Sequence, residues 1–106
     1  MSKFKKDSKD KEMKPMFSLI DPYWQLELAE ILTFGAKKYG LKNWQSASQK
    51  ELYHYEDALL RHMNKYQRGI MRDEDTKLSH LSHVAVNAMF LHYFWRKYDW
   101  KTFNNR

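Results

Sequence analysis

The sequence predicts an all-α fold, a small antiparallel bundle of three main helices that follows a basic N-terminal tail. Three segments repeat apolar residues at helical spacing, and no segment shows the alternation of a β-strand. Roughly ten residues connect one segment to the next, which favours antiparallel neighbours. The 106 residues are 42% hydrophobic and 16% aromatic, so the chain can bury one modest core.

The first helix is expected over residues 22–39. Asp21 can cap it, Pro22 suits its first position, and Gly40 can end it in a left-handed conformation. On a helical wheel its core face is Trp24, Leu28, Ile31, Leu32, Gly35 and Tyr39. A second face is Leu26, Glu27, Glu30 and Phe34. Because apolar residues lie on both faces, we expect a second packing surface and a homo-oligomer.

The second helix is expected to follow a capping box formed by Ser48 and Glu51 and to end before Gly69. Its apolar side is Leu52, Leu59, Met63 and Tyr66. Its opposite side is His54, Asp57, Arg61, Lys65 and Arg68.

The third helix is expected over about residues 77–98, after an acidic loop. Asp75 or Thr76 can supply the cap at its start. Two aromatic residues, Trp100 and Phe103, are expected to anchor the C-terminal end against the bundle.

The charge pattern separates residues 1–14, a predicted disordered tail, from residues 15–106, a single α-helical domain. The tail contains six lysines and three acids, which is half of the formal net charge of +6. Such a tail commonly maintains solubility; binding of nucleic acid through it is an alternative that we do not favour. The sequence has no cysteine, which excludes disulfides and thiolate sites. Without a long apolar run, we expect a cytoplasmic protein with no membrane partner.

Three polar residues of the third helix, His80, His83 and Asn87, share one side of it because they are three and four positions apart. Val84, Leu91 and Phe94 continue that side, so it faces the interior. Two histidines at this spacing can ligate a divalent metal. The alternative is a buried hydrogen-bond network that only fixes helix packing.

Acidic residues form a second candidate group. Glu27 and Glu30 are three positions apart, and paired carboxylates can hold Mg²⁺ or Mn²⁺. Asp57 and either Asp73 or Asp75 could complete an oxygen-rich site. The alternative is a solvated acidic stripe in which Glu30 pairs with a nearby lysine.

A third group surrounds the end of the first helix. Lys37 and Lys38 can contact phosphate, Tyr39 and Trp44 can stack on a base, and Asn43 can bind its edge. The alternative is that the lysines complement the helix dipole and that Trp44 covers the core.

The second helix supplies a basic edge of Arg61 and Lys65 beside His62. Arginine can bind phosphate through two parallel hydrogen bonds. A surface ion pair between Asp57 and Arg61 is the alternative.

The runs FGAKKYGLKNW, ALLRH and HLSHVAVNAMFL, with an acidic loop before the last, occur in an order that resembles the dATP/dGTP diphosphohydrolase N-terminal family of phages and bacteria. The similarity covers roughly residues 14–91. The family looks related to MazG-like all-α nucleoside triphosphate pyrophosphohydrolases. The resemblance implies a metal-dependent helical enzyme that cleaves between the α and β phosphates, releasing a monophosphate and pyrophosphate.

The family pattern is matched at Glu30, Lys37, Lys38, Tyr39, Gly40, Asn43, Trp44, Arg61, His62, Asp73, Asp75, His80, His83 and Asn87. The chain departs from this pattern at Ile70, where a glutamate usually follows the loop glycine, and at Lys77, where the pattern favours glycine. The third helix also carries histidines and an amide in place of the carboxylates that MazG-like enzymes use. These departures weaken the expectation of metal binding and catalysis more than that of nucleotide binding.

Two functions from different classes follow. The first is a metal-dependent pyrophosphohydrolase of a purine (deoxy)nucleoside triphosphate, with Mg²⁺ or Mn²⁺ as cofactor. Its expected catalytic residues are Glu30, His80 and His83. Its expected metal ligands are Glu27, Glu30, Asp57, Asp73 and His83. Its expected substrate-binding residues are Lys37, Lys38, Tyr39, Asn43, Trp44, Arg61, His62, Lys65 and Asn87. The second is a non-catalytic phage protein that sequesters a nucleotide or a nucleotide-derived signal. A third, weaker alternative is a nucleic-acid or protein adaptor.

Overall fold

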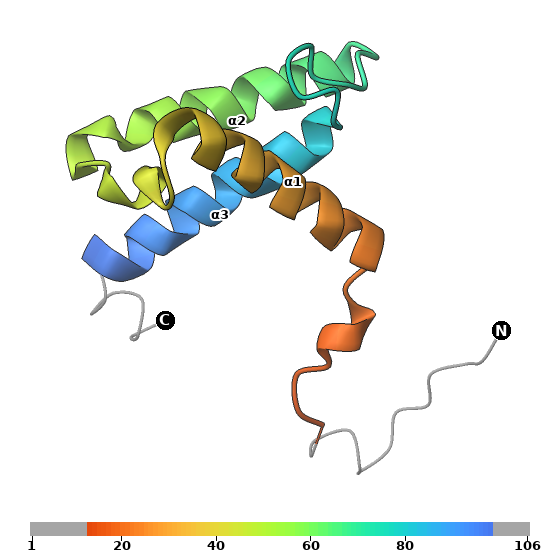
Figure 1. Ribbon diagram of the computed structural model, residues 1–106, viewed down its shortest axis with the longest axis horizontal. Coiled ribbons are helices and arrows are strands. Elements are labelled where there is room, and N and C mark those ends of the chain that lie inside the picture. The colour runs from red at the N-terminus through yellow and green to blue at the C-terminus, as the bar shows by residue number, and fades with distance from the viewer. Residues whose placement is uncertain (1–12, 99–106) are drawn as a thin grey trace, which may run out of the picture.

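The computed structural model describes residues 13–98, and these form an all-helical fold, as predicted (Figure 1). Its three main helices are α1 (Pro22–Tyr39), α2 (Leu52–Gln67) and α3 (His80–Tyr98). Short 3₁₀ helices are η2 (Phe17–Leu19), η3 (Asn43–Ser46) and η4 (Gln49–Glu51). Helices α2 and α3 form a hairpin that α1 crosses, and α3 packs against both of the others. None of the described helices is long and apolar enough to cross a membrane.

Both ends of α1 agree with the prediction. The carboxylate of Asp21 accepts a hydrogen bond from the backbone N–H of Tyr23 at 3.0 Å, which caps the first turn. Gly40 ends the helix with φ of 102°, and its N–H donates to the carbonyl of Ala36. A side chain at position 40 would strain this backbone, so the glycine fixes where the chain turns toward η3.

The capping box before α2 is also confirmed. Glu51 accepts hydrogen bonds from the N–H of Ser48 at 3.0 Å and from its hydroxyl at 2.8 Å. Residues 49–51 form a 3₁₀ turn, so the α-helix itself begins at Leu52. Gly69 follows its end with φ of 87°.

The predicted start of the third helix was wrong by three residues. Lys77 has φ of 64°, a left-handed conformation that a helix cannot include. An antiparallel bridge between Arg72 and Ser79 closes the loop before the helix. The helix therefore begins at His80, and the hydroxyl of Ser79, not Asp75 or Thr76, accepts the N–H of Leu81 at 3.0 Å.

The core lies where α3 meets the other helices. Phe94 and Val86 of α3 and Ile31 of α1 are its buried hydrophobic residues in the described chain. Trp44 of η3 stacks on Phe90 with ring centroids 4.5 Å apart, and Tyr55 of α2 lies 4.9 Å from the same ring. This aromatic cluster joins α2, α3 and η3.

Helical-wheel reasoning placed the core faces only in part. Ile31 is buried, as expected, but Trp24 and Tyr39 at the two ends of the predicted face of α1 are exposed. In α2, Tyr66 is exposed, and Tyr55, which the prediction left out, packs against α3 instead. Both errors concern where one helix contacts another, which the helical wheel of a single segment does not show.

On the second face of α1, Leu26 and Phe34 are 57% and 42% exposed, so the described residues cover each only in part. A homo-oligomer therefore stays a prediction. Of the predicted tail, only Met13 and Lys14 are among the described residues, and both are exposed. The predicted anchors Trp100 and Phe103 lie outside the described residues.

Candidate functional site

One open cavity of about 860 Å³ lies between the C-terminal half of α1, the turn that leads into η3, the middle of α2, the loop before α3, and α3 itself. Its size falls within the range of small-molecule sites. The polar and aromatic residues that line it are Thr33, Phe34, Tyr39, Lys42, Asn43, Trp44, Tyr55, Arg61, His62, Asp73, Asp75, Thr76, His83, Asn87 and Phe90.

The cavity gathers most of the predicted substrate-binding residues and His83, but not all of the predicted site. Glu27, Glu30, Lys37 and Lys38 are not part of its lining, and Glu30 and both lysines are exposed. Asp57 and Lys65 line a separate hollow on α2, where Arg61 contributes to both. Arg61 and His83 therefore share one cavity, whereas Glu30 faces elsewhere.

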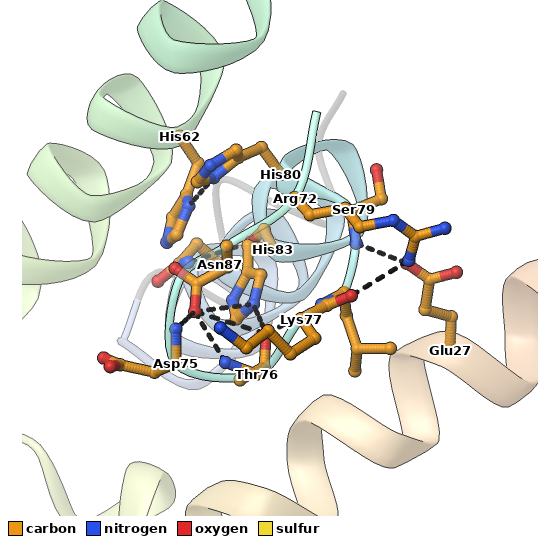
Figure 2. A network of polar contacts seen from close by, with 12 residues as sticks. Glu27, His62, Arg72, Asp75, Thr76, Lys77, Ser79, His80, His83 and Asn87 are labelled. Atoms are coloured by element: carbon orange, nitrogen blue, oxygen red, sulfur yellow. Dashed lines mark hydrogen bonds and ion pairs between the residues drawn. The ribbon is translucent and has the colours of Figure 1, made fainter. Parts of the chain in front are cut away.

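Three histidines from two helices meet at the wall of the cavity (Figure 2). The Nδ1 atoms of His62 on α2 and His80 on α3 are 2.7 Å apart, so one donates a hydrogen bond to the other. The ring of His62 also stacks on that of His83, with centroids 4.4 Å apart. His80 is only 1% exposed, and it lies behind the other two. The predicted side of α3 thus gains a partner, His62, which sequence spacing could not place beside it.

The loop before α3 fixes Asp73 beside these histidines. Its Oδ2 accepts hydrogen bonds from the N–H groups of Asp75 and Thr76 at 3.0 and 2.9 Å. The hydroxyl of Thr76 lies 3.3 Å from the same oxygen and 2.7 Å from Nε2 of His83. The carboxylate of Asp73 and Nε2 of His83 are themselves 3.9 Å apart. Thr76 therefore bridges the acid and the imidazole, a role that the sequence signalled only as a capping position.

The electrostatics of this cluster favour neutral histidines. Burial, followed by the proximity of His83 and His80, lowers the pKa of His62 from 6.5 to about 4. Burial likewise lowers the pKa of His83, although Asp73 opposes that change. Burial by itself would raise the pKa of Asp73, but its hydrogen bonds from Thr76 and Asp75 and the nearby His83 outweigh it, and that pKa falls below 3.8. Near pH 7 the carboxylate of Asp73 therefore lies beside the neutral imidazoles of His62 and His83.

The two glutamates of α1 have different surroundings. Oε1 of Glu27 accepts the backbone N–H of Ser79 at 2.6 Å, which ties α1 to the start of α3 (Figure 2). Glu30, one turn further, is exposed. Of the five residues predicted to hold Mg²⁺ or Mn²⁺, only Asp73 and His83 lie at the cavity. Binding of Mg²⁺ or Mn²⁺ therefore stays a prediction, with Asp73 and His83 as its predicted ligands at the cavity.

The two aromatic residues predicted to stack on a base differ in how much of each ring is exposed. Trp44 lines the cavity but packs against Phe90, so it also covers the core, as its alternative interpretation proposed. Tyr39 is 63% exposed at the rim, with Nζ of Lys38 5.3 Å from the centre of its ring. Lys42, which sequence reasoning missed, has a left-handed φ of 56° and lines the cavity. Its place between a helix-ending glycine and the Asn43-Trp44 pair was the signal that could have identified it.

Comparisons with known proteins support the family resemblance of the sequence. A family model described as dATP/dGTP diphosphohydrolase, N-terminal, matches residues 4–103 of the chain. A curated relative from Salmonella phage PMBT28, named dATP/dGTP diphosphohydrolase, is 38% identical over 82 residues. That alignment includes 77% of this chain and 27% of the relative, so the chain spans about a quarter of the relative's length. No solved structure matches the chain.

Proposed function

The chain belongs to the dATP/dGTP diphosphohydrolase N-terminal family, and on this premise we propose that its cavity binds a purine (deoxy)nucleoside triphosphate and hydrolyses it to a monophosphate and pyrophosphate in a cation-dependent reaction. The observation that carries the proposal is that Arg61, His83 and Asp73, from α2, α3 and the loop between them, line one cavity. Cationic, basic and acidic groups at one site are the combination that hydrolysis of a phosphoanhydride bond needs.

The phosphate end of the nucleotide is assigned to the basic residues. Arg61 is exposed at the mouth of the cavity, and its planar guanidinium can bind two phosphate oxygens at once. Lys42 adds a second positive charge from the turn after α1. Lys37 and Lys38, predicted for the same role, lie outside the lining and would act only through the field that they add.

The base end is assigned to the rim formed by the end of α1 and η3. Tyr39 exposes a ring face that a purine can stack on, and Asn43 offers an amide to the base edge. Trp44 supports this surface from below because Phe90 holds its ring.

His83 is the group best suited to take a proton. Its lowered pKa keeps it neutral near pH 7, and Thr76 and Asp73 orient its ring. In the proposed step a water oxygen bonds to the α-phosphorus, the bond from that phosphorus to the bridging oxygen breaks, and pyrophosphate leaves with the electron pair. The proton of the water goes to His83. Because Glu27, Glu30 and Asp57 lie outside the cavity lining, we assign no step to Mg²⁺ or Mn²⁺. Whether the reaction requires a cation is measured separately in the assay.

A second candidate function is binding without turnover. The observation that favours it is the position of Glu30 and Asp57, two predicted metal ligands that lie away from the cavity. The same residues would then hold a nucleotide or a nucleotide-derived signal, and none of them would need to transfer a proton.

The test is to incubate the purified chain with dATP or dGTP, with Mg²⁺, with Mn²⁺ and with chelator, and to separate the products by ion-exchange chromatography. We expect monophosphate and pyrophosphate in equal amounts. His83→Asn should lower the rate by about 100-fold, the usual contribution of a general base. Arg61→Ala should raise KM and lower kcat, because it removes a phosphate contact.

Matched controls are His54→Asn and Arg96→Ala, which change exposed residues that do not line the cavity. Both should retain the activity of the parent chain. Nucleotide binding without product would favour sequestration over hydrolysis. A chain that neither binds nor cleaves either nucleotide, although folded by circular dichroism, would contradict both functions.

A further inference from the structure

The strongest unassigned feature is a set of three metal-ligating side chains from three separate parts of the chain. His62 lies on α2, Asp73 on the loop, and His80 at the start of α3. Each offers a nitrogen or oxygen atom, and these atoms all lie within 4.8 Å of one another. We propose that His62, Asp73 and His80 form a binding site for a divalent transition-metal ion, with Zn²⁺ as its best fit.

The spacing of the donor atoms is close to what such an ion requires. Bonds of about 2.0–2.1 Å in a tetrahedral site place neighbouring ligand atoms roughly 3.3 Å apart. The two Nδ1 atoms of His62 and His80 are 2.7 Å apart, as a hydrogen bond between them demands. The distance between the two Nδ1 atoms needs to increase by less than an ångström to make room for the ion. A rotation of the half-buried His62 ring can provide this increase.

The donor chemistry selects the class of metal. Imidazole nitrogen suits Zn²⁺ and its transition-metal neighbours, whereas Mg²⁺ and Ca²⁺ prefer oxygen ligands. Two histidines and one carboxylate are also a ligand set that catalytic zinc sites use, with a further position left for water or substrate. His62 and Asp73 line the cavity, so that position would face the proposed nucleotide.

The surrounding bonds hold the ligands in place before any ion arrives. The N–H groups of Asp75 and Thr76 both bond to Oδ2 of Asp73, so neither of these bonds occupies Oδ1. His80 is buried at the start of α3. Its backbone N–H donates to the carbonyl of Met71, which anchors this end of the helix to the loop. Partners of this kind orient the ligands of metal sites and raise their affinity.

The competing explanation is that the two histidines form a metal-free hydrogen bond that only joins α2 to α3. Direct metal binding separates the two, and it needs no nucleotide, so its outcome is independent of whether the chain hydrolyses one. The protein should carry no polyhistidine tag and should be stripped with chelator first. Calorimetric titration with Zn²⁺ should give a single ion per chain, and Mg²⁺ should give no heat at the same concentration.

Variants then identify the ligands. Asp73→Asn and His62→Gln should each weaken Zn²⁺ binding at least about 100-fold, as loss of a ligand must exceed the effect of losing a supporting partner. Matched controls are His54→Gln and His92→Gln, which change the two histidines outside the cluster of His62, His80 and His83 and should bind Zn²⁺ as the parent does. Substitution with Co²⁺ should give the visible absorption of a low-coordinate site in the parent and not in His62→Gln.

His80 is buried, so His80→Gln is assessed by thermal unfolding as well. Zn²⁺ should raise the Tm of the parent and of the two control variants, and leave the Tm of His80→Gln unchanged. The proposal is overturned if the parent binds no Zn²⁺, or if His54→Gln and His92→Gln reduce binding as much as the cluster variants do.

Discussion

The loop and helix start at residues 72–83 and the helix α1 form two sides of the same cavity, yet they are built differently. On the loop side, Asp73, Thr76 and His83 are held by hydrogen bonds to one another and to backbone. On the α1 side, Tyr39 and Phe34 reach the cavity while 63% and 42% exposed. One side is preorganised and the other is lightly packed.

If the proposed function is correct, this difference suits the two sides to different tasks. Groups that transfer protons or hold ions must keep their geometry, and a network of bonds provides it. Groups that stack on a base tolerate some movement, which an exposed tyrosine at a helix end allows. Helix α1 is joined to the rest chiefly through α3, by Ile31 in the core and by the bond from Ser79 to Glu27. Substitutions on the two sides should therefore lower the free energy of unfolding by different amounts.

The largest difference is expected between two phenylalanines. Phe94→Ala on α3 empties a fully buried position and should lower the free energy of unfolding by about 3–5 kcal/mol. Phe34→Ala on α1 removes a side chain that is 42% exposed and should cost less than about 1 kcal/mol. Urea denaturation followed by circular dichroism measures both. Equal losses would show that α1 packs as tightly as the hairpin, against the comparison.

Within the loop, the carboxylate of Asp73 should contribute more to the free energy of unfolding than that of its exposed neighbour Glu74. Asp73→Ala leaves two N–H groups and the hydroxyl of Thr76 without their acceptor and should cost about 2–3 kcal/mol. Glu74→Ala changes an exposed acid and should stay within about 0.5 kcal/mol of the parent. Both are measured in chelator, so that a bound ion does not contribute. A small loss in Asp73→Ala would mean that the loop does not depend on these bonds.

These two sides also differ in how far the sequence predicted them. Local signals were reliable: Pro22 and Gly40 marked both ends of α1, and Ser48 with Glu51 marked the capping box. Each of these depends on residues within one turn of each other, which is the range that capping rules cover. The side of α3 that carries His80, His83 and Asn87 was likewise correct, since helical spacing fixes it once the helix exists.

What the sequence could not show depended on contacts between distant residues. Glu27 and Glu30 are indistinguishable by spacing, but only one of them meets the N–H of Ser79, 52 residues away. His62 beside His80 is a contact between helices that neither helix alone can predict. The start of α3 was misplaced because Lys77 adopts a left-handed conformation, and that geometry comes from the closed loop rather than from lysine itself.

The histidine cluster predicts a dependence of stability on pH. In the unfolded chain His62 takes up a proton near its ordinary pKa of 6.5, whereas in the folded chain it does so only near 4. Between these values the unfolded state binds more protons, so stability falls as the pH is lowered from about 6.5 to about 4. The lowered pKa of His83 adds an effect of the same sign.

Because His62 is only half buried, solvent screening should limit its contribution to about 1–2 kcal/mol. Urea denaturation in chelator at several pH values across this range measures it. His62→Gln should flatten the profile, and His54→Gln should leave its slope unchanged. A parent profile with no slope between pH 4 and about 6.5 would mean that the cluster accepts protons without cost in the folded state.

The smallest expected effect tests the link between the two sides directly. Glu27→Ala removes the acceptor for the N–H of Ser79 and should cost about 1 kcal/mol, whereas Glu30→Ala on the exposed side of the same helix should cost less than about 0.5 kcal/mol. Glu27→Gln keeps an oxygen at this position and should recover part of the loss. Hydrogen exchange followed by NMR would report the amide of Ser79 itself.

Protection of that amide should fall in Glu27→Ala and stay at the parent level in Glu30→Ala, because only the first substitution exposes the N–H at the start of α3. If both variants behaved alike, the two glutamates would act as a pair, as their spacing first suggested, and α1 would belong to the preorganised side. If only Glu27 matters, its carboxylate fixes the start of α3 and, through it, the position of the buried His80 and of His83 in the cavity wall.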